Sequence, residues 1–426
     1  EAARLDDTDP HTHRALAEAL ERVDQPADAV VHWTIARRLA PDDPATALGL
    51  GRARLSAGDA HGAVAILRQA LPASDGDAVR PEGDAALHAV LAEALLATGR
   101  VGDALAHAAA AIELEPQSAA AWHAQAEVRR VAGDDDGARA ALAEAARLAP
   151  SAAAHAAVAE MDDARGDAAA SIVSWRRVLE RDPEHAVAAL RYGRRVAQEG
   201  WQLELAVPAP APAIDPDVAA YTEIVLGRAL SRLEGADAAA ADRTLAVVRS
   251  RAGQIGGAVE AARAAVALSP DAESLLVRAF TQLTAGDPSA ALADLRLAAA
   301  RGSDDARQHA LASSAHLAAG EMDAAAESLL AAIERAPDLA ELPCRLAEIQ
   351  LASGDRSAAA GTLRLAAALA MDPATERRLA GLALDAGAPE VACIVLEARA
   401  SSDPNDPVLL ALLAEARRRV GDMSGA

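Results

Sequence analysis

Residues 44–77 read PATALGLGRARLSAGDAHGAVAILRQALPASDGD. Alanine and leucine are frequent on both sides of the sequence Ala57-Gly58-Asp59. Alanine is the strongest helix former, and its small side chain lets neighbouring helices approach closely. Glycine adopts the left-handed conformation that ends many helices, and an aspartate just after it caps the next helix. The stretch therefore predicts two helices joined by a tight turn.

The glycine of this turn recurs along the chain at intervals of 33 or 34 residues. Two intervals are longer: 41 residues separate Gly58 from Gly99, and 53 residues separate Gly200 from Gly253. A fixed period in this range indicates a solenoid of stacked helix pairs, in which each unit packs only on its neighbours. The other members of the series are Gly133, Gly166, Gly286, Gly320, Gly354, Gly387 and Gly421.

Residues of similar size recur at fixed positions of the unit. Counted from the first residue of the quoted stretch, positions 8, 20, 24 and 27 hold a small, a small, a large and a small residue, namely Gly51, Ala63, Leu67 and Ala70. In the other units position 20 is again small: Ala29, Ala104, Ala138, Ser171, Ala258, Ala291, Ala325, Ala359 and Ala392. A proline, which cannot continue a helix, closes most units: Pro41, Pro116, Pro150, Pro183, Pro270, Pro337 and Pro404.

This pattern resembles the tetratricopeptide repeat, a helix–turn–helix module of 34 residues. The resemblance covers nearly the whole chain and implies an all-α fold, a right-handed α-solenoid (superhelix) of about twelve repeats. It also implies that the first helix of each pair lines a concave groove. The units start near Pro10, Pro44, Ala85, Ala119, Ala152, Ala186, Ala239, Ala272, Ala306, Ala340, Pro373 and Pro407.

Two insertions interrupt the repeats. Residues 72–84 have the composition of a surface loop. Residues 201–217 begin at Trp201 and continue with alternating proline and alanine, which favours an extended polyproline II conformation. A helix is expected to resume over residues 218–233. The second insertion has three open roles: packing into the groove, binding a partner, or acting as a hinge between two arrays.

The ends of the chain fall inside repeats. The opening sequence EAARL is repeated at 144–148, where it ends a second helix. Because terminal repeats normally carry a polar capping face, we expect a window on a longer polypeptide, with self-association through the uncapped ends left open. We therefore expect four parts: the tail of a preceding repeat at 1–9, an N-terminal array at 10–200, the insertion at 201–217, and a C-terminal array at 218–426 that is truncated in its last repeat.

Composition narrows the classes of function. The formal net charge is −22, and all 41 basic residues are arginine. An acidic surface argues against nucleic acid as a partner, because binding needs a basic face. The two cysteines, Cys344 and Cys393, have neither disulfide nor metal-binding spacing. No apolar run approaches the roughly 18 residues that a membrane span requires.

The sequence contains no catalytic constellation and no cofactor motif. Histidines at position 4 of their units fit a space-filling role against the paired helix, and they lack the spacing of a zinc site. These histidines are His13, His88, His155 and His309. We therefore predict no catalytic residue, no metal and no cofactor.

The resemblance places positions 2, 5, 9 and 12 of each unit on the groove. By that rule the groove presents Arg14, Glu18, Glu21, Arg52, His123, Glu127, Arg130, Leu190, Arg194, Arg243, Val247, Leu276, Phe280, Arg377 and Glu415. A second group surrounds the proline-rich insertion and comprises Arg191, Arg194, Arg195, Arg243 and Arg251, together with Trp201. Because the arginine fork suits carboxylates, a ligand with an acidic terminus is expected there.

The leading prediction for function is a protein–protein interaction scaffold that binds a partner peptide or helix in the groove. Two alternatives stay open: a regulatory or substrate-presenting arm of a larger enzyme, and an envelope scaffold for polymer export or motility. A cytoplasmic location is favoured because no signal-peptide pattern is present, although the sequence opens at Glu1 and not at a methionine.

Overall fold

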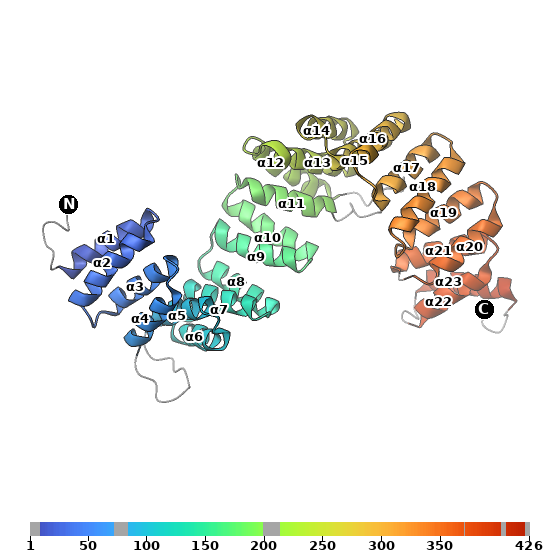
Figure 1. Ribbon diagram of the computed structural model, residues 1–426. Helices are drawn as coiled ribbons and strands as arrows, with labels where there is room; N and C mark the ends of the chain where they lie inside the picture. Colours follow the sequence, from blue (N-terminus) through green and yellow to red (C-terminus); the bar gives the residue numbers. More distant parts are fainter. Residues whose placement is uncertain (1–8, 72–83, 199–213, 370, 402–405, 422–426) are drawn as a thin grey trace. The chain divides into compact units, whose positions relative to one another are not determined.

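The computed structural model describes residues 9–71, 84–198, 214–369, 371–401 and 406–421. These residues form 23 helices and no strand (Figure 1). The chain comprises two compact units, Glu1–Pro183 and Glu184–Ala426, called unit 1 and unit 2 below. The predicted all-α, repeat-based fold is confirmed.

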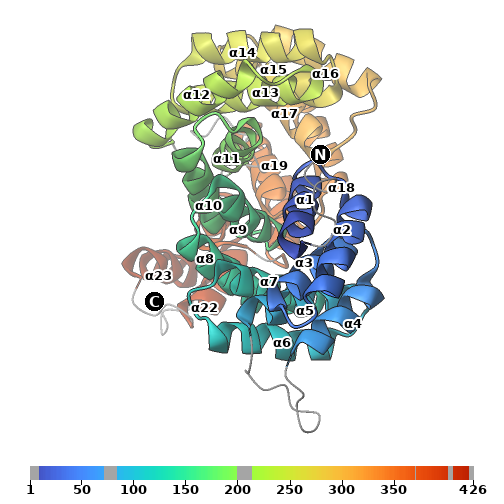
Figure 2. The same cartoon turned by 90° about the vertical axis from the view of Figure 1, so that its left-hand side faces the viewer.

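Unit 1 contains five helix pairs. In each pair the two helices pack on one another, and the second helix also packs on the first helix of the next pair, as can be followed in Figure 2. The helices are α1 (Pro10–Arg22), α2 (Pro26–Leu39), α3 (Pro44–Ser56), α4 (Ala60–Ala70), α5 (Ala85–Ala97), α6 (Val101–Leu114), α7 (Ala119–Val131), α8 (Asp135–Leu148), α9 (Ala152–Ala164) and α10 (Ala168–Arg181).

Unit 2 contains six further pairs and a last helix that packs on α22. This arrangement agrees with the prediction of about twelve repeats. The helices are α11 (Ala186–Gln198), α12 (Pro216–Leu230), α13 (Gly235–Arg251), α14 (Ile255–Leu268), α15 (Ala272–Thr284), α16 (Pro288–Ala300), α17 (Ala306–Ala318), α18 (Met322–Arg335), α19 (Glu341–Ala352), α20 (Arg356–Ala366), α21 (Pro373–Asp385), α22 (Pro389–Ala400) and α23 (Pro407–Val420).

The turns within the pairs have the predicted chemistry. Gly58 has φ 84°, a left-handed conformation that glycine adopts without a steric penalty. The Asp59 side chain then accepts a hydrogen bond of 2.9 Å from the backbone N–H of Gly62, which caps α4. Glu321 does not cap α18 in this way; its carboxylate instead lies 2.6 Å from Nδ1 of His316. An acidic residue after the turn glycine therefore does not cap the next helix in every repeat.

Small residues make the contact between the helices of each pair. At Gly51 a Cβ atom would lie only 2.6 Å from Cδ2 of Leu67, so a larger residue there would displace that leucine. All described residues at position 8 that face a paired helix are small and buried: Ala17, Gly51, Ala92, Ala126, Ala159, Gly193, Ala246, Ala279, Ser313, Ala347 and Ala380. Those at position 20 are equally small, and Ala63 and Ala104 have no exposed surface.

The helices around the second insertion differ in detail from the prediction. α12 begins at Pro216 and ends at Leu230, earlier than the expected 218–233, because Asp215 caps it by accepting hydrogen bonds from the backbone of Asp217 and Val218. α12 packs on α11, so the insertion separates the two helices of a single pair. Trp201 and most of the two insertions and of the tail at 1–9 lie outside the described residues.

The buried alanines predict a position-specific sensitivity to size. Ala104 and Ala106 are both on α6, but Ala104 has no exposed surface whereas Ala106 is exposed. Ala104→Leu should lower the free energy of unfolding by about 2 kcal/mol or more, because the pair has no room for three more carbons. Ala106→Leu should change it by less than about 0.5 kcal/mol. Urea denaturation followed by circular dichroism compares them, and equal losses would contradict the packing argument.

Candidate functional site

A cavity of about 460 Å³ lies on unit 1 where α1, α2 and α3 meet. Its lining includes Arg14, Glu18, Glu21 and Arg52, the residues of the first two repeats that were predicted to face the groove. The full lining is Arg14, Glu18, Glu21, Arg22, Trp33, Ala45, Leu48, Gly49 and Arg52. The surface formed by the first helices of successive pairs, called the first-helix surface below, is therefore hollowed at this point.

The cavity has an aromatic floor and charged walls. Trp33 is only 3% exposed, and it lies so close beneath Gly49 that a Cβ atom there would be 2.3 Å from its ring. The indole N–H of Trp33 donates a 2.8 Å hydrogen bond to Glu21, and Arg52 lies 3.7 Å from the same carboxylate. The contact with Glu21 fixes the orientation of the ring, so the floor is held in place.

Further along unit 1, α5 and α7 carry a second polar group. The predicted residues Glu127 and Arg130 form an ion pair of 2.7 Å on α7. Glu93 on α5 is half-buried, and burial raises its pKa above the ordinary value; the charge of Glu127 adds to this rise, and His123 and Arg52 oppose it. The sequence analysis did not single out Glu93, although it stands at position 9 of its unit, a groove position.

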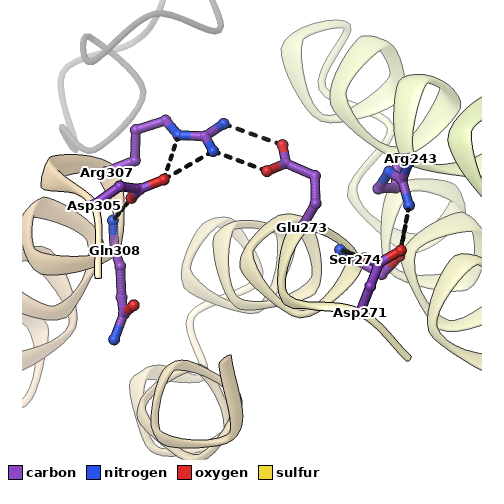
Figure 3. Close-up of polar contacts among 7 residues, drawn as sticks. All are labelled: Arg243, Asp271, Glu273, Ser274, Asp305, Arg307 and Gln308. Carbon is purple, nitrogen blue, oxygen red and sulfur yellow. Dashed lines mark hydrogen bonds and ion pairs between the residues drawn. The ribbon is translucent and has the colours of Figure 1, made fainter. Parts of the chain in front are cut away.

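In unit 2, Arg243 on α13 is held by the neighbouring repeat (Figure 3). Its guanidinium donates to the carboxylate of Asp271 at 3.2 Å and to the hydroxyl of Ser274 at 2.9 Å, and its side chain is 17% exposed. Burial alone would raise the pKa of Asp271, but hydrogen bonds from Ser274 and Ser269 and the charge of Arg243 hold it below the ordinary value. Arg243 therefore already has an acidic partner.

Arg194 on α11 is placed differently. It is exposed, and it forms neither a hydrogen bond nor an ion pair with the described residues. Partial burial lowers its pKa, the positive charges of Arg243 and Arg191 lower it further, and Asp237 opposes them. The positive charges of Arg191 and Arg243 therefore lie close enough to repel that of Arg194.

The remaining predicted residues have mainly structural contacts. Arg251 donates from Nη1 to the backbone carbonyl of Val196 at 3.3 Å and so ties α13 to α11. Phe280 is 7% exposed and belongs to the core cluster that contains Leu276 and Leu295. Groove position alone therefore did not separate surface residues from core residues.

Arginines on the other first helices of unit 2 are also paired. Arg307 on α17 donates to Glu273 on α15 at 2.8 Å and to Asp305 at 2.9 Å (Figure 3). Arg378 on α21 reaches Glu348 on α19 at 2.8 Å. These contacts join adjacent repeats and cancel charge along the first-helix surface, so most of its arginines are engaged.

No metal-binding cluster is found within the described part of the chain. Among those residues, no three His, Cys, Asp or Glu side chains are placed to hold a metal ion. Burial raises the pKa of Cys344 to about 12, so this thiol stays protonated. None of the described helices combines the length and the apolar character that crossing a membrane requires.

Comparisons with known proteins agree with this architecture. A family model described as a tetratricopeptide repeat matches residues 14–78 and 90–153. A solved tetratricopeptide repeat protein from Parabacteroides merdae is 16% identical to this chain. The aligned region covers 61% of this chain and 96% of that protein, with a TM-score of 0.41. A thermophilic tetratricopeptide repeat protein from Thermus thermophilus is 20% identical. The aligned region covers 44% of this chain and 99% of that protein, with a TM-score of 0.38. The search of curated proteins finds no match.

The different contacts of Arg243 and Arg194 predict different effects of the same substitution. Arg243→Gln should lower the free energy of unfolding by about 2 kcal/mol, because a charged hydrogen-bonding partner of Asp271 is lost. Arg194→Gln should change it by less than about 0.5 kcal/mol, because no contact is lost and like-charge repulsion falls. Urea denaturation of the full chain measures both, and a greater loss for Arg194→Gln would contradict the assignment.

Proposed function

The chain belongs to the tetratricopeptide-repeat family, and we propose that it is an interaction scaffold whose first-helix surfaces bind segments of partner proteins. The repeats bury their apolar residues between helices and leave long faces for contact, as interaction solenoids do. The observation that carries the proposal is the unit 1 cavity, in which Trp33 forms a fixed floor and Arg52 stands at the rim.

The chemistry of the cavity favours a particular kind of segment. Tryptophan and arginine are enriched among residues that dominate binding energy, especially where an apolar pocket is ringed by polar groups. An apolar side chain of the partner would approach Trp33. Arg14 and Glu18, which pair with each other at 3.1 Å, would exchange that contact for charges on either side of that apolar side chain. We therefore propose a peptide with one apolar anchor flanked by charged residues.

For unit 2 we propose that Arg194 receives an acidic group of a partner, such as a side-chain or terminal carboxylate. The support is that Arg194 has no hydrogen-bond or ion-pair partner among the described residues, together with the repulsion from Arg191 and Arg243. A carboxylate at this point would accept hydrogen bonds from the arginine fork and relieve the repulsion. Arg243 would contribute charge while staying bound to Asp271.

The unit 1 proposal is tested by selecting peptides from a random displayed library against the full chain. Peptides that bind unit 1 should lose at least about tenfold in affinity to Arg52→Glu, because the variant puts a negative charge beside Glu21 at the cavity. Arg38→Glu is the matched control, since Arg38 is exposed on α2 and is not in the cavity lining. Selected peptides that lose affinity equally to both variants would contradict binding in the cavity.

The unit 2 proposal is tested with peptides that carry or lack a free carboxyl terminus and acidic side chains. Arg194→Gln should lower the affinity for the acidic peptides by about tenfold and leave the affinity for amidated, neutral versions unchanged. Arg296→Gln removes the same charge from an exposed position of α16 and should have little effect. Isothermal titration calorimetry at low salt measures the affinity of each peptide for each variant. If both variants lowered the affinity equally, the loss would be explained by the change in net charge, and Arg194 would not be a specific contact.

A further inference from the structure

Two histidine pairs join the helices of alternate repeats in unit 1. Nδ1 of His13 on α1 lies 3.0 Å from Nδ1 of His32 on α2, and the ring centroids are 5.3 Å apart. His88 on α5 and His107 on α6 repeat the contact, again with 3.0 Å between the Nδ1 atoms and with centroids 5.1 Å apart. In both cases the histidine of the first helix is 2% exposed.

The second pair repeats the first in register. Each of the two repeats has a histidine at position 4, an aspartate at position 19 and a histidine at position 23. These are His13, Asp28 and His32 in the first repeat, and His88, Asp103 and His107 in the third. The repeat between them has Ala47 at position 4 and Ile66 at position 23, and its two helices, α3 and α4, pack on each other in the same way. The fold therefore does not require histidines at these positions.

A hydrogen bond between two Nδ1 atoms constrains protonation. One ring must carry a hydrogen on Nδ1, and the other must present a lone pair. A neutral pair satisfies this with opposite tautomers, and a singly protonated pair also satisfies it. When both rings are protonated, two N–H groups face each other and the contact becomes repulsive. The pair thus holds its helices together only while it carries fewer than two added protons.

The surroundings of the second pair oppose protonation. Burial lowers the pKa of His107 to about 4; His88, Arg68 and Arg100 add to this, and Asp103 opposes it. Arg68 comes from α4, Arg100 precedes α6, and both contact Asp103, which weakens its help to the histidine. The charged groups of the other helices packed on α5 are engaged elsewhere, with Arg52 near Glu21, Arg54 near Asp59, Arg129 near Asp134 and Arg130 near Glu127.

We infer that the His88–His107 pair is a proton-sensitive link between α5 and α6, and that acidification opens this repeat of unit 1. When the helices separate, the rings are hydrated and take up protons at the ordinary histidine pKa of 6.5. In the closed form His107 takes up its proton only near pH 4, so between these values the open form binds more protons. The closed form is therefore favoured above pH 6.5 and loses stability as the pH falls from 6.5 towards 4.

The inference does not depend on the proposed partner, but it bears on the same unit. α5 also carries Glu93, whose charge interacts with Arg52 of α3 and His123 of α7. Opening of α5 from α6 would remove the support of this part of the first-helix surface. Mild acid would thereby alter the part of the first-helix surface next to Arg52, which also lines the α1–α3 cavity.

Amide hydrogen exchange of the full chain, corrected for the intrinsic rate at each pH, tests the link. Protection in α5 and α6 should fall about tenfold between pH 7.5 and pH 5.5, because a hydrated histidine of pKa 6.5 is mostly protonated at the lower pH. The double variant His88→Ala/His107→Ile takes the residues that the preceding repeat carries at these positions. In this variant the fall should shrink to the change seen in α15 and α16 of unit 2.

A fall of the same size in the double variant would overturn the inference, because other groups would then cause it. A second measurement covers the case in which the variant does not fold. In the unaltered chain labelled with ¹⁵N-histidine, one ring of the pair should carry its hydrogen on Nδ1 and His107 should titrate well below 6.5. Two rings in the Nε2–H form, or a His107 that titrates near 6.5, would also overturn it.

Discussion

The close contact between the two helices of each repeat is the constraint on which the rest of the structure depends. Small buried residues at positions 8 and 20, such as Gly51 and Ala63, bring the helix axes together. This approach places the large residue at position 24 over the gap: Leu67 packs directly against Gly51, and Trp33 packs against Gly49 of the next repeat. The cavity floor is thus a consequence of core packing. A binding surface built in this way is already ordered before a partner arrives, which lowers the entropic cost of association.

The second determinant is the pairing of charges between adjacent repeats. The chain carries a net charge of −22, so most arginines have a carboxylate within reach. Arg243 and Arg307 illustrate this, because each reaches acids of a neighbouring repeat. An arginine is therefore available for binding where the neighbouring repeat offers no acid and further arginines crowd it. Arg194 is crowded by Arg191 and Arg243 and forms no ion pair with the described residues, although the charge of Asp237 partly offsets theirs. The number of arginines on a surface is therefore a poor guide to its capacity for anions.

The sequence was sufficient for the repeat architecture, since helix propensity, turn glycines and small contact residues are local signals with a fixed period. It did not reveal which side chains meet, because such contacts join residues many positions apart. Arg307 and Glu273 are 34 residues apart, which is one full repeat, so a search at that offset would have found the pair. The histidines of each pair are 19 residues apart. Only His13 and His88 were considered from the sequence, as separate core residues, and their partners were missed. Phe280 was placed on the groove by position alone, whereas its packing decides that it belongs to the core.

The two units offer partners different chemistry, although they share one repeat design. The first-helix surface of unit 1 has an apolar floor at Trp33, a half-buried acid at Glu93 and histidines within its helix pairs. That of unit 2 carries closed ion pairs, and Arg194 on it forms no ion pair with the described residues. Because each repeat packs only on its neighbours, a change of pH or sequence in unit 1 need not reach unit 2. Under both proposals, an apolar anchor would be bound through unit 1 and an acidic group through unit 2, and protonation of the histidine pairs would act on unit 1.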